Sequence, residues 1–391
     1  MVYWDKLTDA ERKHFAGLDF LRVLAIVLVF LCHYRAYARP EWVDIVGRFG
    51  WTGVDLFFVL SGFLIGNQLI GQMLSTGRIN FRTFYISRTF RILPVYFFVL
   101  SLYFLFPVIR ERDGIAPWWQ FVTFTQNFNL DYGTEGSFSH AWSLCIDEQF
   151  YLLLPLCISL VWDRRCRYRV FYVLTAFFLT SVLLRGLNWL HFIEPYYTNN
   201  ITDGRFVAYN KWVYYPSYNR LDGLLVGLGI AALFNFWPNV IQRIGQYANL
   251  LFAIGLLLLA LAYGLLKEDR LDFWPTLIGF PLISFAFGCM VLSAILPKCF
   301  LYRFHWNLSA LLATLSYSIY LCHKFVNHLL QEPLDVVGIP AESGRRVLIC
   351  ALASILVALL LNRVVEYPFM KLKESILRKR QKVVEESLLP T

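Results

Sequence analysis

The stretch GLDFLRVLAIVLVFLCHYRAYA, from Gly17 to Ala38, decides the fold class of this chain. It is long enough to cross a bilayer as a helix, yet it carries Asp19, Arg22 and His33 at depths where hydrocarbon offers polar groups no partner. At about 3.6 residues per turn, Arg22 and His33 share one face roughly 16 Å apart along the axis, and Asp19 falls on that face too. A polar stripe of this kind is expected to face a cavity, where an imidazole is a proton acceptor. The stretch therefore predicts a membrane-embedded active site centred on His33.

The composition of the whole chain also indicates a membrane protein. Of its 391 residues, 58% are apolar and 18% aromatic, and the mean hydropathy is +0.51, outside the usual balance of soluble globular proteins. The first apolar segment is too long for the core of a signal peptide and is not followed by a small-residue cleavage site, so it is expected to stay in the mature protein. The eight cysteines show no metal-ligand spacing and most lie in apolar spans, so neither disulfides nor a metal site are expected.

Apolar runs of about twenty residues predict an all-α, polytopic protein with about ten transmembrane helices. The expected spans are 17–38, 51–74, 92–109, 140–162, 170–190, 217–237, 246–266, 273–296, 306–330 and 346–368. Lys and Arg divide twenty to ten between the alternate connections, which places both termini in the cytoplasm. The net charge of +9 therefore reflects topology in the plasma (inner) membrane and gives no reason to expect a nucleic acid partner. The sequence does not indicate an oligomeric state.

One transmembrane domain is expected at 17–372, between a cytoplasmic segment at 1–16 and a basic cytoplasmic tail at 373–391 that lies on the anionic inner leaflet. Two long aromatic connections, 109–139 and 191–216, are expected outside, where loops of this length line or cover a site. Their aromatic, Asn and Asp side chains suit sugar rings, although an interfacial aromatic belt accounts for the same composition.

The second and fourth spans carry carboxylates at depths close to that of His33. Asp55 is expected roughly 6 Å below the outer end of its span, where it either orients the imidazole or caps the helix. Asp147 and Glu148 are expected about 10 to 12 Å deep, and because neighbours on a helix point about 100° apart, only one of them is expected to face His33. The residues expected above them at the mouth of the site are His140, Trp142 and Ser143.

The inner connection at 81–91, FRTFYISRTFR, alternates arginines with aromatic residues. This pattern is typical of an amphipathic segment at the inner interface, and attraction to lipid headgroups is enough to explain it. A sharper hypothesis is that Arg88 and Arg91, which are neighbours on one helical face, bind the phosphates of a cytoplasmic, nucleotide-bearing donor.

Taken in order, these motifs resemble the acyltransferase 3 family of membrane enzymes, which O-acylate sugars and other extracytoplasmic acceptors. The likeness covers about 17 to 372. The matching residues are Arg22 and His33, separated by ten residues; Asp55 in GVDLFFVLSGFL; Arg88 and Arg91 in RTFRILP; and Trp142, Ser143, Glu148 and Tyr151 in WSLCIDEQFY. Similar patterns occur at Arg220 to Gly227, Ser316 to His323 and Glu366 to Phe369. Two positions depart from the family pattern: Asp147 replaces the usual Glu, and Thr89 replaces a frequent second arginine.

The resemblance implies a single-domain O-acyltransferase with acyl-CoA, expected to be acetyl-CoA, as co-substrate and no permanently bound cofactor. The donor nucleotide would rest on Arg88 and Arg91 while the pantetheine arm passes Arg22 toward His33. His33 would then act as general base or transient acyl carrier for a hydroxyl of a carbohydrate or glycolipid. The residues expected to bind the acceptor or support the site are Trp142, Ser143, Tyr151, Arg220, Asp222 and His323.

Two alternatives stay open at this point. A transporter or flippase of a lipid-linked sugar would also carry intramembrane charges, although the two halves of the sequence lack paired Gly/Pro-broken helices. Arg220 and Asp222 could bind sugar hydroxyls or pair with polar neighbours. The remaining histidines are assigned ordinary positions, with His14 and His305 at interfaces and His140, His191 and His328 on the outer surface.

Overall fold

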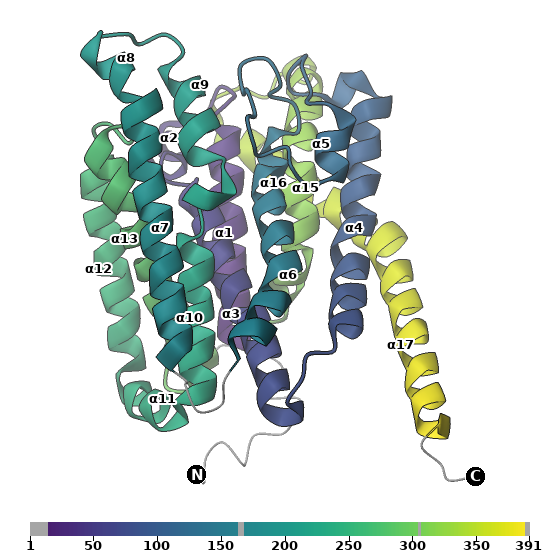
Figure 1. Cartoon of the computed structure of the whole chain (residues 1–391). Helices are drawn as coiled ribbons and strands as arrows, with labels where there is room; N and C mark the ends of the chain where they lie inside the picture. The colour runs from purple at the N-terminus through teal and green to yellow at the C-terminus, as the bar shows by residue number, and fades with distance from the viewer. Residues whose placement is uncertain (1–14, 163–167, 304–305, 388–391) are drawn as a thin grey trace.

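The structure, a computed structural model, describes residues 15–162, 168–303 and 306–387, and throughout these ranges the chain is a bundle of helices (Figure 1). The long helices are α1 (Ala16–Tyr34), α3 (Thr52–Thr76), α4 (Phe81–Leu105), α6 (Trp142–Val161), α7 (Tyr168–Phe192), α10 (Asp222–Phe236), α12 (Ala248–Leu266), α13 (Phe273–Ala294), α15 (Asn307–Val336), α16 (Gly344–Leu361) and α17 (Tyr367–Ser387). The short ones are α2 (Glu41–Gly47), α5 (Trp118–Val122), α8 (Glu194–Thr198), α9 (Arg205–Tyr209), α11 (Pro238–Ile244) and α14 (Phe300–Arg303). Each of the ten predicted spans overlaps a long helix.

Among the described residues, eight helical stretches are long and apolar enough to cross a membrane, which confirms an all-helical, multi-pass membrane protein. The predicted spans at 217–237 and 306–330 are not among these eight helical stretches. Helix α10 has only 15 residues, and α15, with 30 residues, is more polar than the others. The count of ten spans and the cytoplasmic termini stay predictions.

The two ends of the bundle carry different segments (Figure 1). Helices α2, α5, α8 and α9 lie at one end, and α17 runs to the other. The aromatic connections 109–139 and 191–216 contain α5, α8 and α9, so both lie at the same end, as the topology predicts. Following that topology, the end with α2 is called the outer end below, and the opposite end the inner end.

Helix α3 packs closely against its neighbours because glycines line its contacts. A Cβ atom at Gly62 would meet the carbonyl group of Leu224 in α10, and one at Gly227 of α10 would meet a carbonyl of α3. Gly53 faces the carbonyl of Ala25 in α1 in the same way. Contacts of this type are common between membrane helices, where small residues let backbones approach.

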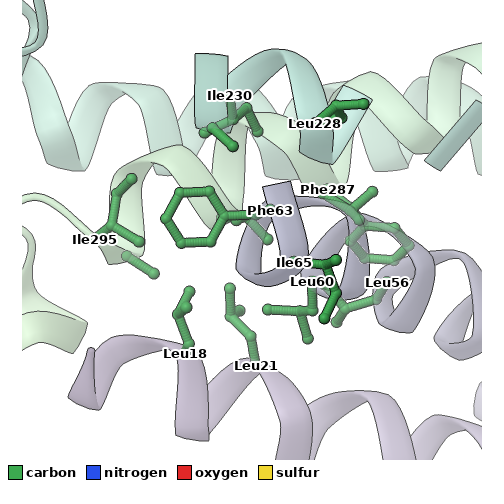
Figure 2. Packing of buried hydrophobic residues seen from close by; sticks show 14 of the residues in the cluster. Leu18, Leu21, Leu56, Leu60, Phe63, Ile65, Leu228, Ile230, Phe287 and Ile295 are labelled. Carbon is green, nitrogen blue, oxygen red and sulfur yellow. The ribbon is translucent and has the colours of Figure 1, made fainter. Parts of the chain in front are cut away.

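A buried apolar cluster joins α1, α3, α10 and α13 (Figure 2). Phe63 of α3 lies among Leu18 and Leu21 of α1 and Ile230 of α10. Since neighbours on a helix point about 100° apart, the packing of Leu21 in this cluster turns the next residue, Arg22, away from it. The core thus fixes the orientation of the polar stripe on α1.

Helix α4, which corresponds to the third predicted span at 92–109, begins earlier than predicted. Asn80 caps its start by accepting a hydrogen bond from the backbone N–H of Thr83 at 3.0 Å, so α4 runs from Phe81. Preceding it, Gly77 ends α3 with a positive φ of 73°, a conformation that glycine adopts without strain. The segment 81–91 is therefore the first three turns of a long helix and not a separate interfacial segment. Its arginines are held on a rigid element.

Candidate active site

His33 is hydrogen-bonded to another histidine. Its Nδ1 lies 2.8 Å from Nε2 of His323 in α15, and Nδ1 of His323 lies 3.0 Å from the carbonyl oxygen of Ile319, one turn earlier. Because a carbonyl oxygen only accepts, Nδ1 of His323 carries the proton, and Nε2 of a neutral His323 accepts from Nδ1 of His33. In this arrangement Nε2 of His33 has no proton. It is therefore available as a base or a nucleophile.

His140 lies inside the bundle, so its predicted position on the outer surface is wrong. Its side chain is 2% exposed, and its ring centroid lies 6.0 Å from that of His33 and 5.5 Å from that of His323. The chain reaches this position because the loop after α5 turns inward at buried Phe138, whose φ is 53°, and continues into the short helix η3 (Ser139–Ala141) ahead of α6. His33, His140 and His323 are called the histidine cluster below.

The other histidines lie away from this cluster or outside the described residues. His191 is exposed near the end of α7, in agreement with its predicted surface position, and His328 is partly buried in α15. His14 and His305 lie outside the described residues. Within the described ranges, no group of three or more His, Cys, Asp or Glu side chains is arranged to hold a metal ion.

A cavity of about 250 Å³ lies among α1, α3, α4, α6 and α15 and is called the central cavity. The charged side chains that line it are Arg22, Arg88, Arg91, Asp147 and Glu148. Both carboxylates line the cavity, whereas the helical spacing predicted that one of them would turn away. Neighbours on a helix point about 100° apart, yet the cavity borders both of these side chains. One oxygen of each carboxylate has no hydrogen-bond partner among the described residues.

The three arginines of the central cavity differ in their partners. Arg22 pairs with Asp19 at 3.0 Å, and Arg91 pairs with Glu366 at 2.9 Å. Arg88 instead donates to the uncharged side chain of Gln68 at 2.7 Å, and its guanidinium lies 5.8 Å from the ring centroid of Phe84 and from that of Tyr151. Among these three, the charge of Arg88 is therefore the least neutralised by a carboxylate in a salt bridge.

The central cavity extends to within one side chain of the histidine cluster. Ser143 and Tyr320 both line it, and their hydroxyl oxygens are 2.7 Å apart. The hydroxyl of Tyr320 donates to the backbone carbonyl of His140 at 2.6 Å, so Ser143 donates to Tyr320. The ring centroid of Tyr320 is 5.5 Å from that of His140 and 6.0 Å from that of His323. A single aromatic side chain thus separates the cavity from the cluster.

Asp55 contacts Arg220, whereas the sequence predicted that it would either orient His33 or cap its helix. Nη2 of Arg220 donates to Oδ1 of Asp55 at 2.8 Å, and both side chains are buried. Arg220 also lies over the rings of Tyr214 and Phe280, with distances of 4.6 and 4.2 Å to their centroids. The partners are 165 positions apart, so helical spacing alone could not reveal this pair.

A second buried ion pair lies beside the first. Asp222 binds Arg185 of α7 at 2.6 Å. Arg220 and Asp222 thus follow the predicted alternative of pairing with polar neighbours. Trp142 lies 5.5 Å from the Arg220 guanidinium, and Tyr151 lines the cavity and donates to Ser61 at 2.9 Å. These contacts hold the start of α6, which carries the carboxylates, against α3 and α10.

At the outer end, Asp44 of α2 gathers three arginines that the sequence patterns did not single out. Asp44 accepts hydrogen bonds from Arg35, Arg39 and Arg48 at 2.9, 2.8 and 2.9 Å. The hydrogen bonds from Arg35, Arg48 and Arg39 hold the pKa of the Asp44 carboxyl well below its usual range. With three arginines against Glu41 and Asp44, the segment 35–48 has a net charge of +1, and it begins two residues beyond His33.

The fold and the site define a multi-pass membrane protein that encloses a polar cavity and a histidine cluster inside its helix bundle. The family model of the acyltransferase 3 group, described as an acyltransferase domain, matches residues 15–363. The chain belongs to this acyltransferase family.

Among known proteins, the chain is similar to O-acetyltransferase OatA of Staphylococcus aureus (strain NCTC 8325 / PS 47). The two are 28% identical over 336 residues, which cover 80% of this chain and 50% of that protein. OatA of strain COL and OatA of strain MRSA252 give the same values. The chain thus spans about half the length of the curated relatives it matches. No solved structure matches the chain.

Proposed function

We propose that this chain is a membrane O-acyltransferase that moves an acyl group, expected to be acetyl, from cytoplasmic acyl-CoA to a hydroxyl of a carbohydrate or glycolipid at the outer side. The family and the relatives named O-acetyltransferase support the reaction class. The observation that carries the proposal is the hydrogen bond between Nδ1 of His33 and His323, which leaves Nε2 of His33 as a base within the histidine cluster. Tyr320 separates this cluster from the central cavity.

The central cavity supplies the groups that an acyl-CoA needs. Arg88, with no carboxylate partner in the described salt bridges, is suited to a donor phosphate, while Arg91 and Arg22 add positive charge. The pantetheine arm carries amide N–H donors. The unpaired oxygens of Asp147 and Glu148 can accept hydrogen bonds from these donors, which assigns both carboxylates to donor binding. The thioester would then lie near Ser143 and Tyr320.

The transfer step follows from the protonation of His33. Nε2 of His33 takes the proton of the acceptor hydroxyl, and the oxygen attacks the carbonyl carbon of the thioester. The carbon–sulfur bond breaks, and the CoA thiolate receives the proton from His33. A general base of this kind contributes a factor of about 100 to 10,000 in rate. In the alternative route, Nε2 attacks the thioester first, the carbon–sulfur bond breaks and CoA leaves as its thiolate. The acceptor oxygen then attacks the acyl-imidazole, its proton goes to the thiolate, and Nε2 is released.

Purified protein in nanodiscs, given radiolabelled acetyl-CoA and a panel of glycans and glycolipids, tests the proposal. Label is expected on at least one acceptor, and His33→Ala is expected to reduce transfer by at least about 100-fold while CoA binding is kept. His191→Ala, at an exposed histidine away from the site, is the matched control. Label retained on the protein without acceptor would identify the acyl-imidazole route.

Two results would overturn the proposal. One is wild-type protein that binds no CoA by calorimetry, since this measurement does not depend on the acceptor. The other is His33→Ala protein with undiminished transfer. In the first case, movement of a lipid-linked sugar across the bilayer becomes the function to measure.

A further inference from the structure

The imidazole of His140 has no role in the reaction described above, yet it is buried and its ring nitrogens make no hydrogen bond to the described residues. Its side chain is 2% exposed, and neither ring nitrogen has a hydrogen-bond partner among the described residues. The backbone of Leu321 lies beside the ring without forming a well-shaped hydrogen bond. Leaving buried donors and acceptors unpaired is costly, so a ring of this kind in a native protein calls for a ligand.

The position of His140 is fixed by contacts that leave its nitrogens free. Its ring meets Phe138 edge to face, with centroids 5.0 Å apart and an angle of 85°, and Tyr320 holds its backbone carbonyl with a hydrogen bond of 2.6 Å. Ser143, three positions later, bonds to the same Tyr320 hydroxyl. The imidazole is therefore held beside Tyr320, which lines the central cavity, and its centroid is 6.0 Å from that of His33.

We propose that His140 is a further catalytic residue, whose ring N–H donates a hydrogen bond to the carbonyl oxygen of the acyl thioester. This inference rests on the proposed function. As the acceptor oxygen attacks, negative charge develops on the carbonyl oxygen, and a donor already oriented in a site that excludes water stabilises that charge without reorganisation. His140 keeps its proton throughout: the charge passes to the departing sulfur, and His33 alone exchanges protons with the substrates.

The arrangement of the cluster separates the two tasks. His33 has a hydrogen-bond partner that leaves it a free lone pair, which suits a base. His140 has no such partner, and a neutral imidazole always presents one N–H. The two rings come from α1 and from η3, and their centroids are 6.0 Å apart. A thioester that passes Tyr320 and reaches the histidine cluster would therefore find a base on one ring and a hydrogen-bond donor on the other.

Replacement of His140 in the full-length protein tests the inference. His140→Phe keeps an aromatic ring in the apolar pocket beside Phe138 but removes the donor, and His140→Gln keeps an N–H donor that cannot transfer a proton. The kcat of acetyl transfer, the affinity for CoA and the melting temperature are measured for each, with the exposed His191→Phe as control. For His140→Phe, a fall in kcat of about 100- to 1,000-fold is expected. CoA affinity and melting temperature are expected to stay near the wild-type values.

The outcomes distinguish the inference from the proposed function. His140→Gln is expected to lie between wild type and His140→Phe, because the amide donor restores part of the stabilisation. Wild-type kcat in His140→Phe would overturn the inference and leave the proposed function standing, since His140 would then serve packing alone. A His140→Gln variant as inactive as His140→Phe, with normal stability, would also overturn it by indicating proton transfer. Wild-type protein without CoA-dependent transfer would overturn both.

Discussion

Replacing His323 by leucine tests how His33 is held in its reactive form. The change removes the acceptor that lies 2.8 Å from Nδ1 of His33 and leaves a buried N–H without a partner. Such a loss costs about 1–3 kcal/mol, which corresponds to a fall of about 5- to 150-fold in kcat if it is felt in the transition state. A larger loss is expected where His33 moves its proton to Nε2, because that tautomer has no base facing the substrate.

The assay compares kcat and CoA affinity in His323→Leu and His323→Gln. The glutamine side-chain oxygen can accept from His33, so this variant is expected to keep more activity than the leucine variant. CoA affinity is expected to be unchanged in both, because His323 does not line the central cavity. A folded His323→Leu protein with wild-type kcat would refute the view that His323 positions the base. An equal loss of CoA binding would indicate a structural defect instead.

Two further predictions concern the arginines. Arg88→Ala is expected to weaken CoA binding at least about tenfold, from the loss of a charge-assisted contact of about 1.5–3 kcal/mol. Arg91→Ala is expected to have a smaller effect because Arg91 already pairs with a carboxylate; calorimetry that shows equal effects would contradict this difference. Arg220→Ala leaves Asp55 buried and unpaired and is expected to destabilise the protein by about 3–5 kcal/mol. A melting temperature equal to that of wild type would show that the pair does not support the bundle.

The features that the sequence predicts well are local. Apolar runs locate the helices because each span is continuous. The basic motif and the acidic motif were expected to serve one site, and the structure brings Arg88, Asp147 and Glu148 to one cavity. The location of the helices needs only the order of residues along each span, whereas the meeting of the basic and acidic motifs was expected from the family resemblance.

The features that the sequence does not predict depend on how distant segments meet. His140 precedes α6 at the predicted outer end, and depth alone assigns it to the surface; only the inward turn at Phe138 buries it. The partner of Asp55 could not be chosen from depth either, because several charges share that level and the contact of α3 with α10 decides among them. An available signal was the sequence SHAWSL, in which a histidine stands directly ahead of a helix that carries intramembrane carboxylates.

A measurement of sidedness tests the central claim most directly. Protein is reconstituted in sealed vesicles with a known orientation, with radiolabelled acetyl-CoA supplied only at the inner end and the acceptor only at the outer end. The account predicts that label crosses to the acceptor, that the label is lost with His33→Ala, and that acetyl-CoA at the outer end gives little transfer. Transfer only when donor and acceptor share one side, or transfer that persists in His33→Ala, would contradict it.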